Sequence, residues 1–169
     1  HVSFKTLERA THQPGDECLL GLDVGSTTTK AVLIRKKDDA LLASVYLRTN
    51  GNPIQASLEC YQSLRKQIDQ PVKIIGLGTT GSGRNIAGLH ALTKGVINEI
   101  IAHAVAAAHF DQDVDTIFEI GGQDAKYTYL TNGVASDSAM NEACSAGTGS
   151  FLEEAARESL SIDYRDIAD

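Results

Sequence analysis

The stretch Asp23-Val24-Gly25-Ser26-Thr27-Thr28-Thr29-Lys30 stands between two apolar runs, residues 18–22 and residues 31–34. This pattern predicts a strand, a tight turn and a second strand. The glycine frees the turn backbone for close approach to a ligand, and hydroxyl groups and turn amides donate hydrogen bonds to phosphate oxygens. We therefore predict a site that holds phosphate and hydrated Mg2+, formed by Asp23, Gly25, Ser26, Thr27, Thr28 and Lys30. For this octapeptide alone, the alternative is an ordinary hairpin with a polar tip.

The composition is that of an ordinary globular domain, because 42% of the 169 residues are hydrophobic and 22% are charged. No apolar stretch approaches the ~20 residues that cross a membrane. A net charge of -7 without a basic run argues against nucleic acid as the main partner. The three cysteines include no CxxC pair, so we expect no disulfide framework and a reduced, cytoplasmic protein.

The remaining pattern predicts an α/β chain that follows a polar start. Residues 1–17 contain Pro14-Gly15-Asp16 and are expected to be a tail or an interdomain linker. Strands at 18–22, 31–34 and 40–47 predict an antiparallel meander. Apolar spacing of three and four residues predicts a helix over 54–68. Further segments predict a buried strand at 72–75, a helix over 96–110, a buried strand at 116–120, a hairpin over 126–135 and a helix over 151–160.

A second glycine-and-acid turn, Gly121-Gly122-Gln123-Asp124, follows the predicted strand at 116–120. Backbone amides at a double glycine can meet a phosphate, and Gln123 or Asp124 can orient a water or bind Mg2+ through water. Two such turns, each followed by a hairpin strand, imply a nucleotide that is bound from both sides. Neither turn fits the Walker A pattern, which requires GxxxxGK[ST].

Three further features leave alternatives open. Glycines 76, 78 and 81 fit GxGxxG, and a dinucleotide site would need an acid about 20 residues further on, at the end of a strand. Glu99 has that spacing but falls within a predicted helix, and Glu119 lies nearly twice as far along, so we favour a glycine loop that lets a helix approach the cleft. Glu99 and His103 are one helical turn apart and are interpreted as a structural or switch-region pair. Cys144 precedes a predicted helix, where the helix dipole favours thiolate, and structural and functional roles are equally supported.

Together these stretches resemble the ATP-dependent activators of 2-hydroxyacyl-CoA dehydratases, which are related to the ATP-binding subunits of benzoyl-CoA reductase. The first motif alone indicates only the wider actin, Hsp70 and sugar-kinase superfamily, and the last two narrow the resemblance to the activators. The motifs are Gly21-Leu-Asp-Val-Gly-Ser-Thr-Thr-Thr-Lys30, Gly78-Thr-Thr-Gly-Ser-Gly-Arg-Asn85, Asn98-Glu-Ile-Ile-Ala-His-Ala104, Glu119-Ile-Gly-Gly-Gln-Asp-Ala-Lys126 and Met140-Asn-Glu-Ala-Cys-Ser-Ala-Gly-Thr-Gly149.

The resemblance implies an actin-like ATPase (ribonuclease H-like) subdomain with a mixed five-stranded sheet, an antiparallel meander and flanking helices. It implies ATP, Mg2+ and a shared 4Fe-4S cluster as cofactors, and low-potential electron transfer driven by ATP hydrolysis. The implied partners are a 2-hydroxyacyl-CoA dehydratase or benzoyl-CoA reductase-type component, a second subunit or paired domain around the cluster, and reduced ferredoxin or flavodoxin as donor. By motif, Cys144 is a cluster ligand, and Asp23, Gln123 and Asp124 are catalytic beside the phosphate-binding Gly121 and Gly122.

The family's second cysteine ligand and its adenosine-binding segment have no counterpart in these 169 residues. We therefore expect residues 18–169 to be the N-terminal part of an actin-like ATPase domain whose C-terminal part lies outside this chain. A sugar or small-metabolite kinase of the same superfamily and a noncatalytic regulatory ATP-binding module are the alternative functions.

Overall fold

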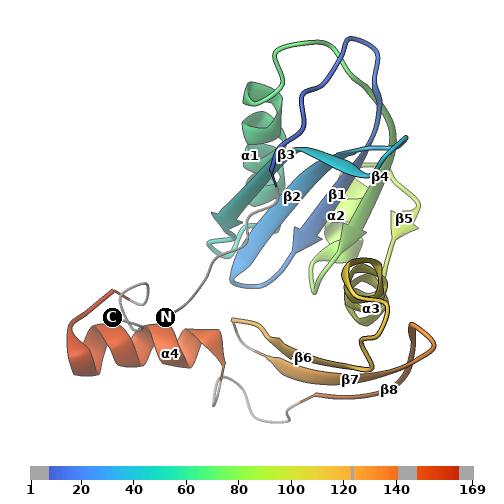
Figure 1. Ribbon diagram of the computed structural model, residues 1–169. Coiled ribbons are helices and arrows are strands. Elements are labelled where there is room, and N and C mark those ends of the chain that lie inside the picture. Colours follow the sequence, from blue (N-terminus) through green and yellow to red (C-terminus); the bar gives the residue numbers. More distant parts are fainter. Residues whose placement is uncertain (1–7, 123, 141–147, 164–169) are drawn as a thin grey trace. The chain divides into compact units, whose positions relative to one another are not determined.

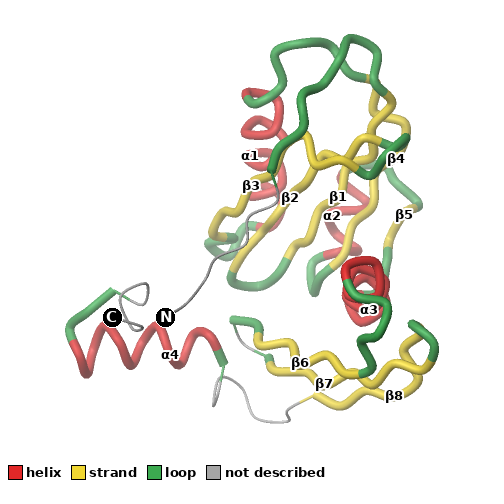
Figure 2. The backbone as a smooth tube through the Cα atoms, viewed as in Figure 1, coloured by secondary structure: helices red, strands yellow, loops and turns green. Residues whose placement is uncertain are grey.

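The computed structural model describes residues 8–122, 124–140 and 148–163, which fall into two compact units (Figures 1 and 2). The first unit comprises the described residues up to Glu99, and the second begins at Ile100. Both units combine helices with a β-sheet, which confirms the predicted α/β class. None of the helices in these described ranges is both long and apolar enough to cross a membrane.

The first unit is built on a mixed five-stranded sheet with the strand order β3-β2-β1-β4-β5. β1 to β3 form the predicted antiparallel meander, while β4 runs parallel to β1 and β5 runs parallel to β4. This arrangement confirms the predicted mixed sheet and places β1 at its centre. In chain order the strands are β1 (Glu17–Val24), β2 (Thr28–Arg35), β3 (Ala40–Arg48), β4 (Lys73–Thr80) and β5 (Gly95–Val96).

Two helices cover one face of this sheet. α1 (Pro53–Lys66) packs on β2 and β3, α2 (Arg84–His90) packs on β4, and the two helices contact each other. α1 begins where its local sequence favours a start, because the Asn52 side chain accepts a hydrogen bond from the Gln55 N–H at 3.1 Å and a proline follows Asn52. The core between α1 and the sheet includes Leu22, Leu33, Cys60 and Leu64.

β4 is longer than the sequence predicts. The predicted strand ends at residue 75, but the strand runs through Gly76 and Gly78 as far as Thr80 and pairs with β1 over that length. Gly76 lies opposite Leu19, and a Cβ at Gly76 would stand 2.9 Å from the Leu19 side chain. The glycine therefore provides room for a side chain of the neighbouring strand and does not end the strand.

The start of the helix predicted over 96–110 was also wrong. Val96 belongs to β5 and pairs with Thr79, and the Ile97 N–H donates to the Thr79 carbonyl at 2.8 Å. The helix, α3 (Glu99–Phe110), begins three residues later. The apolar spacing that begins at Val96 is that of a helix, but pairing with β4 holds Val96 and Ile97 outside the helix.

In the second unit, α3 is followed by a three-stranded antiparallel sheet of β6 (Thr116–Ile120), β7 (Ala125–Thr131) and β8 (Val134–Met140). The predicted hairpin is confirmed, and its turn contains Asn132 and Gly133, both with positive φ. β6 is not the buried strand that was predicted, because Phe118 is 76% exposed and Ile120 is 63% exposed. α4 (Gly149–Ala155), followed by a π-helical turn over Ala156–Leu160, occupies the range of the last predicted helix.

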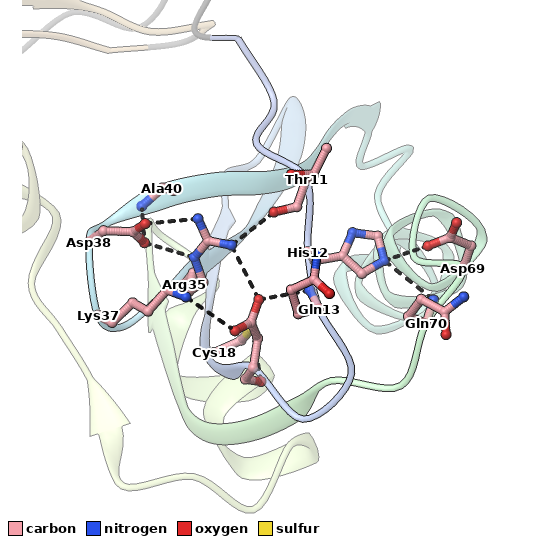
Figure 3. A network of polar contacts seen from close by, with 11 residues as sticks. Thr11, His12, Gln13, Cys18, Arg35, Lys37, Asp38, Ala40, Asp69 and Gln70 are labelled. Carbon is pink, nitrogen blue, oxygen red and sulfur yellow. Dashed lines mark hydrogen bonds and ion pairs between the residues drawn. The ribbon is translucent and has the colours of Figure 1, made fainter.

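The described part of the polar start, residues 8–16, lies against the sheet of the first unit. The Ala10 N–H donates to the Leu41 carbonyl at 2.8 Å, and the Gly15 N–H donates to the Pro71 carbonyl at 2.8 Å. Figure 3 shows the polar network beside these contacts, in which the Arg35 guanidinium binds Asp16, Asp38 and the Thr11 carbonyl. The assignment of residues 1–17 as a tail or linker stays a prediction.

This network predicts how stability depends on pH. The Arg35 guanidinium lowers the pKa of Asp38, and the backbone N–H of Gln13, followed by Arg35, lowers the pKa of Asp16. Both carboxylates therefore stabilise the fold above the pKa of an unfolded Asp, about 3.9, and this contribution is lost as the pH falls through their lower folded values. We expect Arg35→Gln to unfold at a lower urea concentration than the wild type at pH 7 and to lose less of its remaining stability on acidification.

Urea unfolding curves between pH 7 and pH 3 measure this difference. Arg9→Gln is the matched control, because it removes one positive charge whose guanidinium approaches only the Ser44 oxygens in the described network, at 3.5 Å. Equal pH slopes for the wild type and Arg35→Gln would contradict the assignment.

Candidate functional site

The turn between β1 and β2 is tight and leaves no room for a side chain at its glycine. The Gly25 N–H donates to the Thr28 carbonyl at 2.9 Å and closes the turn. A Cβ at Gly25 would lie 2.9 Å from the same carbonyl oxygen. Ser26 at the tip is exposed, and Thr27 beside it is half-buried. The structure thus brings the predicted residues Gly25, Ser26, Thr27 and Thr28 together in one compact turn.

Thr49, just after β3, donates two hydrogen bonds to the backbone of this turn. Its N–H donates to the Thr27 carbonyl at 2.9 Å, and its hydroxyl donates to the Gly25 carbonyl at 2.8 Å. The Thr29 hydroxyl lies 3.0 Å from the Thr49 hydroxyl and must be the donor, because the Thr49 proton is already used. Sequence reasoning missed Thr49, since it lies 20 residues from Thr29 in the chain and belongs to no motif. Its buried threonine pair fixes the shape of the turn.

Asp23 and Lys30 face each other across β1 and β2. The Lys30 ammonium lies 3.0 Å from the Asp23 carboxylate, and the two side chains are 38% and 31% exposed. Lys30 also lies 5.6 Å from the ring centre of Tyr46, its neighbour on β3. An exposed, paired carboxylate and ammonium beside a glycine turn can bind a hydrated cation and an anionic oxygen respectively.

A second glycine loop, between β4 and α2, packs against the end of β1. Gly81 has φ +87°, and a Cβ there would lie 2.5 Å from both the Asp23 carboxylate and the Val24 carbonyl. The Gly83 N–H donates to the same carbonyl at 2.7 Å. The predicted glycine loop exists over residues 81–83, directly before α2, and its close approach limits where the Asp23 carboxylate can lie.

The predicted second turn joins β6 to β7 in the second unit. The Gly121 N–H donates to the Asp124 carbonyl at 2.8 Å, and Asp124 is exposed. The Gly121 carbonyl accepts a hydrogen bond from the N–H of Gly149, the first residue of α4, at 2.9 Å. The turn is therefore attached to the helix that follows Cys144 in the chain. Gln123 and Cys144 lie outside the described residues.

A charged cluster lies beside this second turn. The Glu119 carboxylate, on β6, lies 2.7 Å from the His103 ring of α3 and 3.5 Å from the Lys126 ammonium of β7. The Lys126 side chain is only 9% exposed, so its charge needs a close carboxylate. The cluster fixes α3 to the two strands that carry the turn. Sequence reasoning paired His103 with Glu99, which stays a prediction, and did not identify Glu119 as its contact.

The described cysteines behave as structural residues. Cys18 and Cys60 are both buried and unoxidised, and burial raises the pKa of the Cys60 thiol to about 11. A buried thiol with a raised pKa is a poor nucleophile and metal ligand, as expected of a structural cysteine. Within residues 8–122, 124–140 and 148–163, no three His, Cys, Asp or Glu side chains gather into a group that could hold a metal ion.

The predicted site residues thus fall into two local groups. Asp23, Gly25, Ser26, Thr27, Thr28 and Lys30 share the β1–β2 turn of the first unit, and Gly121, Gly122 and Asp124 share the β6–β7 turn of the second. Each group forms a tight turn that is closed by a backbone hydrogen bond at its glycine. Their joint action on one nucleotide stays a prediction.

Activators of 2-hydroxyacyl-CoA dehydratases are among the proteins that this chain resembles. The chain is 31% identical over 153 residues to the (R)-2-hydroxyglutaryl-CoA dehydratase activating ATPase of Acidaminococcus fermentans, covering 89% of this chain and 56% of that protein. Its structure is similar to the crystal structure of the A. fermentans (R)-2-hydroxyglutaryl-CoA dehydratase component A, with a TM-score of 0.77 and 29% identity over 89% of this chain and 57% of that one.

A second solved structure agrees. The activator of 2-hydroxyisocaproyl-CoA dehydratase from Clostridium difficile, with bound ADPNP, has a TM-score of 0.75 and 29% identity over 87% of this chain and 53% of that one. These neighbours confirm the predicted actin-like fold. The chain spans about half the length of the curated relatives that it matches. The family model of the BadF/BadG/BcrA/BcrD ATPases matches residues 20–169, and the chain belongs to this family.

Proposed function

We propose that this chain is the N-terminal part of an ATPase that activates a 2-hydroxyacyl-CoA dehydratase or a related acyl-CoA reductase by low-potential electron transfer. The observation that carries the proposal is the β1–β2 turn, in which Gly25 excludes a side chain and Asp23 and Lys30 lie paired and partly exposed beside it. Relatives named as dehydratase activators support the choice of partner.

ATP binding is assigned to the two glycine turns. A similar protein of known structure binds ADPNP, an ATP analogue. In this chain, Gly25 leaves room for the phosphates, the amides of Ser26 and Thr27 and the hydroxyls of Ser26, Thr27 and Thr28 meet their oxygens, and Lys30 turns from Asp23 to the phosphates. The Asp23 carboxylate then binds Mg2+ through water. In the other turn, Gly121 and Gly122 let the backbone approach the phosphates and Gly122 offers its amide, while Gln123 and Asp124 orient the attacking water.

The electron-transfer part of the proposal rests on Cys144. The group that it would hold with the other cysteine ligands, a shared 4Fe-4S cluster, supplies one-electron transfer at low potential. Support comes from the hydrogen bond between the Gly149 N–H and the Gly121 carbonyl, which ties the helix after Cys144 to the second phosphate turn. A change in that turn on ATP hydrolysis would therefore be passed through this hydrogen bond to Gly149 and along the chain to Cys144. A second subunit or paired domain completes the cluster site, and reduced ferredoxin or flavodoxin supplies the electron.

Replacing the Asp23 carboxylate tests the nucleotide site. We expect Asp23→Asn in the full-length protein to lower kcat/KM for ATP about 100-fold, because the neutral amide no longer attracts hydrated Mg2+. Phosphate release measures turnover, and calorimetry measures ADPNP binding. Asp39→Asn is the matched control, since Asp39 lies in the exposed turn between β2 and β3 and asparagine tolerates its φ of 53°. Turnover in Asp23→Asn equal to that of the control would remove Asp23 from the site.

The close approach of Gly81 gives a second prediction. Gly81→Ala places a methyl group against the Asp23 carboxylate, so we expect at least about tenfold weaker ADPNP binding and a loss of stability. Gly15→Ala is the control, because Gly15 also has positive φ but a Cβ there meets no atom within 4 Å. That variant is expected to lose only about 1 kcal/mol of unfolding free energy from backbone strain and to bind ADPNP normally. Equal binding by both variants would contradict the contact.

Cys144→Ser tests the electron-transfer part separately. We expect the full-length protein, purified without oxygen, to contain iron and acid-labile sulfide that Cys144→Ser loses and that Cys60→Ser keeps. Iron and sulfide analysis and the visible spectrum, recorded with and without ATP, measure this. A wild-type protein that hydrolyses ATP but holds no iron after reconstitution would favour the kinase or the regulatory-module alternative.

A further inference from the structure

The last residue of β4, Thr80, has a hydroxyl that the described fold leaves without a partner. Its oxygen is buried, and among residues 8–122, 124–140 and 148–163 no atom forms a hydrogen bond with it. The preceding residue behaves differently, since the Thr79 hydroxyl donates to the Arg84 carbonyl at 3.0 Å. A buried, unpaired hydroxyl destabilises a protein relative to a methyl group of the same shape. The state described here therefore gives no structural reason for threonine over valine at position 80.

Thr80 lies next to the most important carboxylate of the candidate site. In the parallel pairing of β1 and β4, its register partner is Asp23, so the two side chains leave the sheet on the same face. Strands lie about 5 Å apart, which puts the hydroxyl within a side-chain rotation of the carboxylate. Register partners on neighbouring strands form a row across this face of the sheet: Thr80 on β4, Asp23 on β1, Lys30 on β2 and Tyr46 on β3. Thr80 is the end of this row on β4.

Under the proposed function, the donors available to Asp23 change when nucleotide binds. In the described structure the Lys30 ammonium neutralises the carboxylate at 3.0 Å, and the Gly81 backbone restricts its other oxygen. Once Lys30 turns to the phosphates, the carboxylate loses that donor at the moment it must be aimed at Mg2+. The Thr80 hydroxyl is an adjacent donor that breaks no hydrogen bond to any of the described residues when it turns to Asp23.

We propose that Thr80 is a positioning residue whose hydroxyl donates to the Asp23 carboxylate in the nucleotide-bound state and orients it toward hydrated Mg2+. This inference rests on the proposed function of the β1–β2 turn. It assigns a role to the segment Gly78–Arg84, to which neither phosphate turn belongs. Hydrogen bonds of this kind to a carboxylate at a metal site fix its orientation and raise metal affinity.

The proposal predicts opposite effects on stability and on function. Thr80→Val keeps the branched shape and removes only the hydroxyl, so the nucleotide-free full-length protein should be as stable as the wild type or more stable. Thr79→Val is the matched control and should be less stable, because it removes the hydrogen bond that the Thr79 hydroxyl donates to the Arg84 carbonyl. With ATP, Thr80→Val should need about tenfold more Mg2+ for half-maximal turnover, and Thr80→Ser should restore the wild-type Mg2+ dependence.

Urea unfolding without nucleotide, and ATP turnover and ADPNP binding over a series of Mg2+ concentrations, decide between the outcomes. An unchanged Mg2+ dependence in Thr80→Val overturns the role of Thr80, as does Thr80→Ser behaving like Thr80→Val, which would indicate a packing effect of the methyl group. If the wild type itself neither binds ADPNP nor hydrolyses ATP, the proposed function fails together with this inference. Wild-type turnover with a normal Thr80→Val variant removes only the inference.

Discussion

The pairing of β1 with an antiparallel neighbour on one side and a parallel neighbour on the other is the constraint on which the first unit depends. Antiparallel pairing with β2 turns the chain back immediately after Val24, and parallel pairing with β4 delivers a second chain segment to the same sheet edge. Two loops therefore meet at the carboxyl end of β1, where Gly81 contacts Asp23 and Gly83 hydrogen-bonds Val24. Glycines are needed at this junction because the two backbones approach more closely than a Cβ allows.

At the end of β1, the apolar side chains lie on one face of the sheet and the charged side chain lies on the other. Leu22 and Val24 point into the core under the helices, whereas Asp23 between them points to the opposite face and remains partly exposed. The same alternation on β2 puts Ala31 in the core and Lys30 beside Asp23. A shift of one residue in the pairing of these strands would bury the charges and expose the core. The hydrophobic core thus fixes the position of the ion pair.

Features encoded in nearby residues could be predicted from the sequence, and those created by distant contacts could not. The meander, the turn at Gly25, the hairpin at Asn132–Gly133 and the sheet class follow from local alternation, turn residues and motif. The contacts of Thr49 and the position of Thr80 opposite Asp23 were missed because they come from the pairing of distant segments, which no local pattern shows. β4 was predicted too short because Gly76 and Gly78 look like breakers until Leu19 and Gly21 lie opposite them. Phe118 was expected to be buried because residues 116–120 are mostly apolar, but an apolar segment does not show what covers it.

The hydrogen bond between Gly149 and Gly121 has a thermodynamic consequence for the proposed activator. It gives the β6–β7 turn and α4, the helix after Cys144, a shared backbone contact, so a rearrangement that breaks this contact acts on both places. Coupling of this kind is reciprocal: the factor by which a nucleotide changes the affinity or potential of a group at Cys144 is the factor by which that group's state changes nucleotide affinity. In such a protein the redox state of the bound group would itself set the balance between ATP and ADP at the turn.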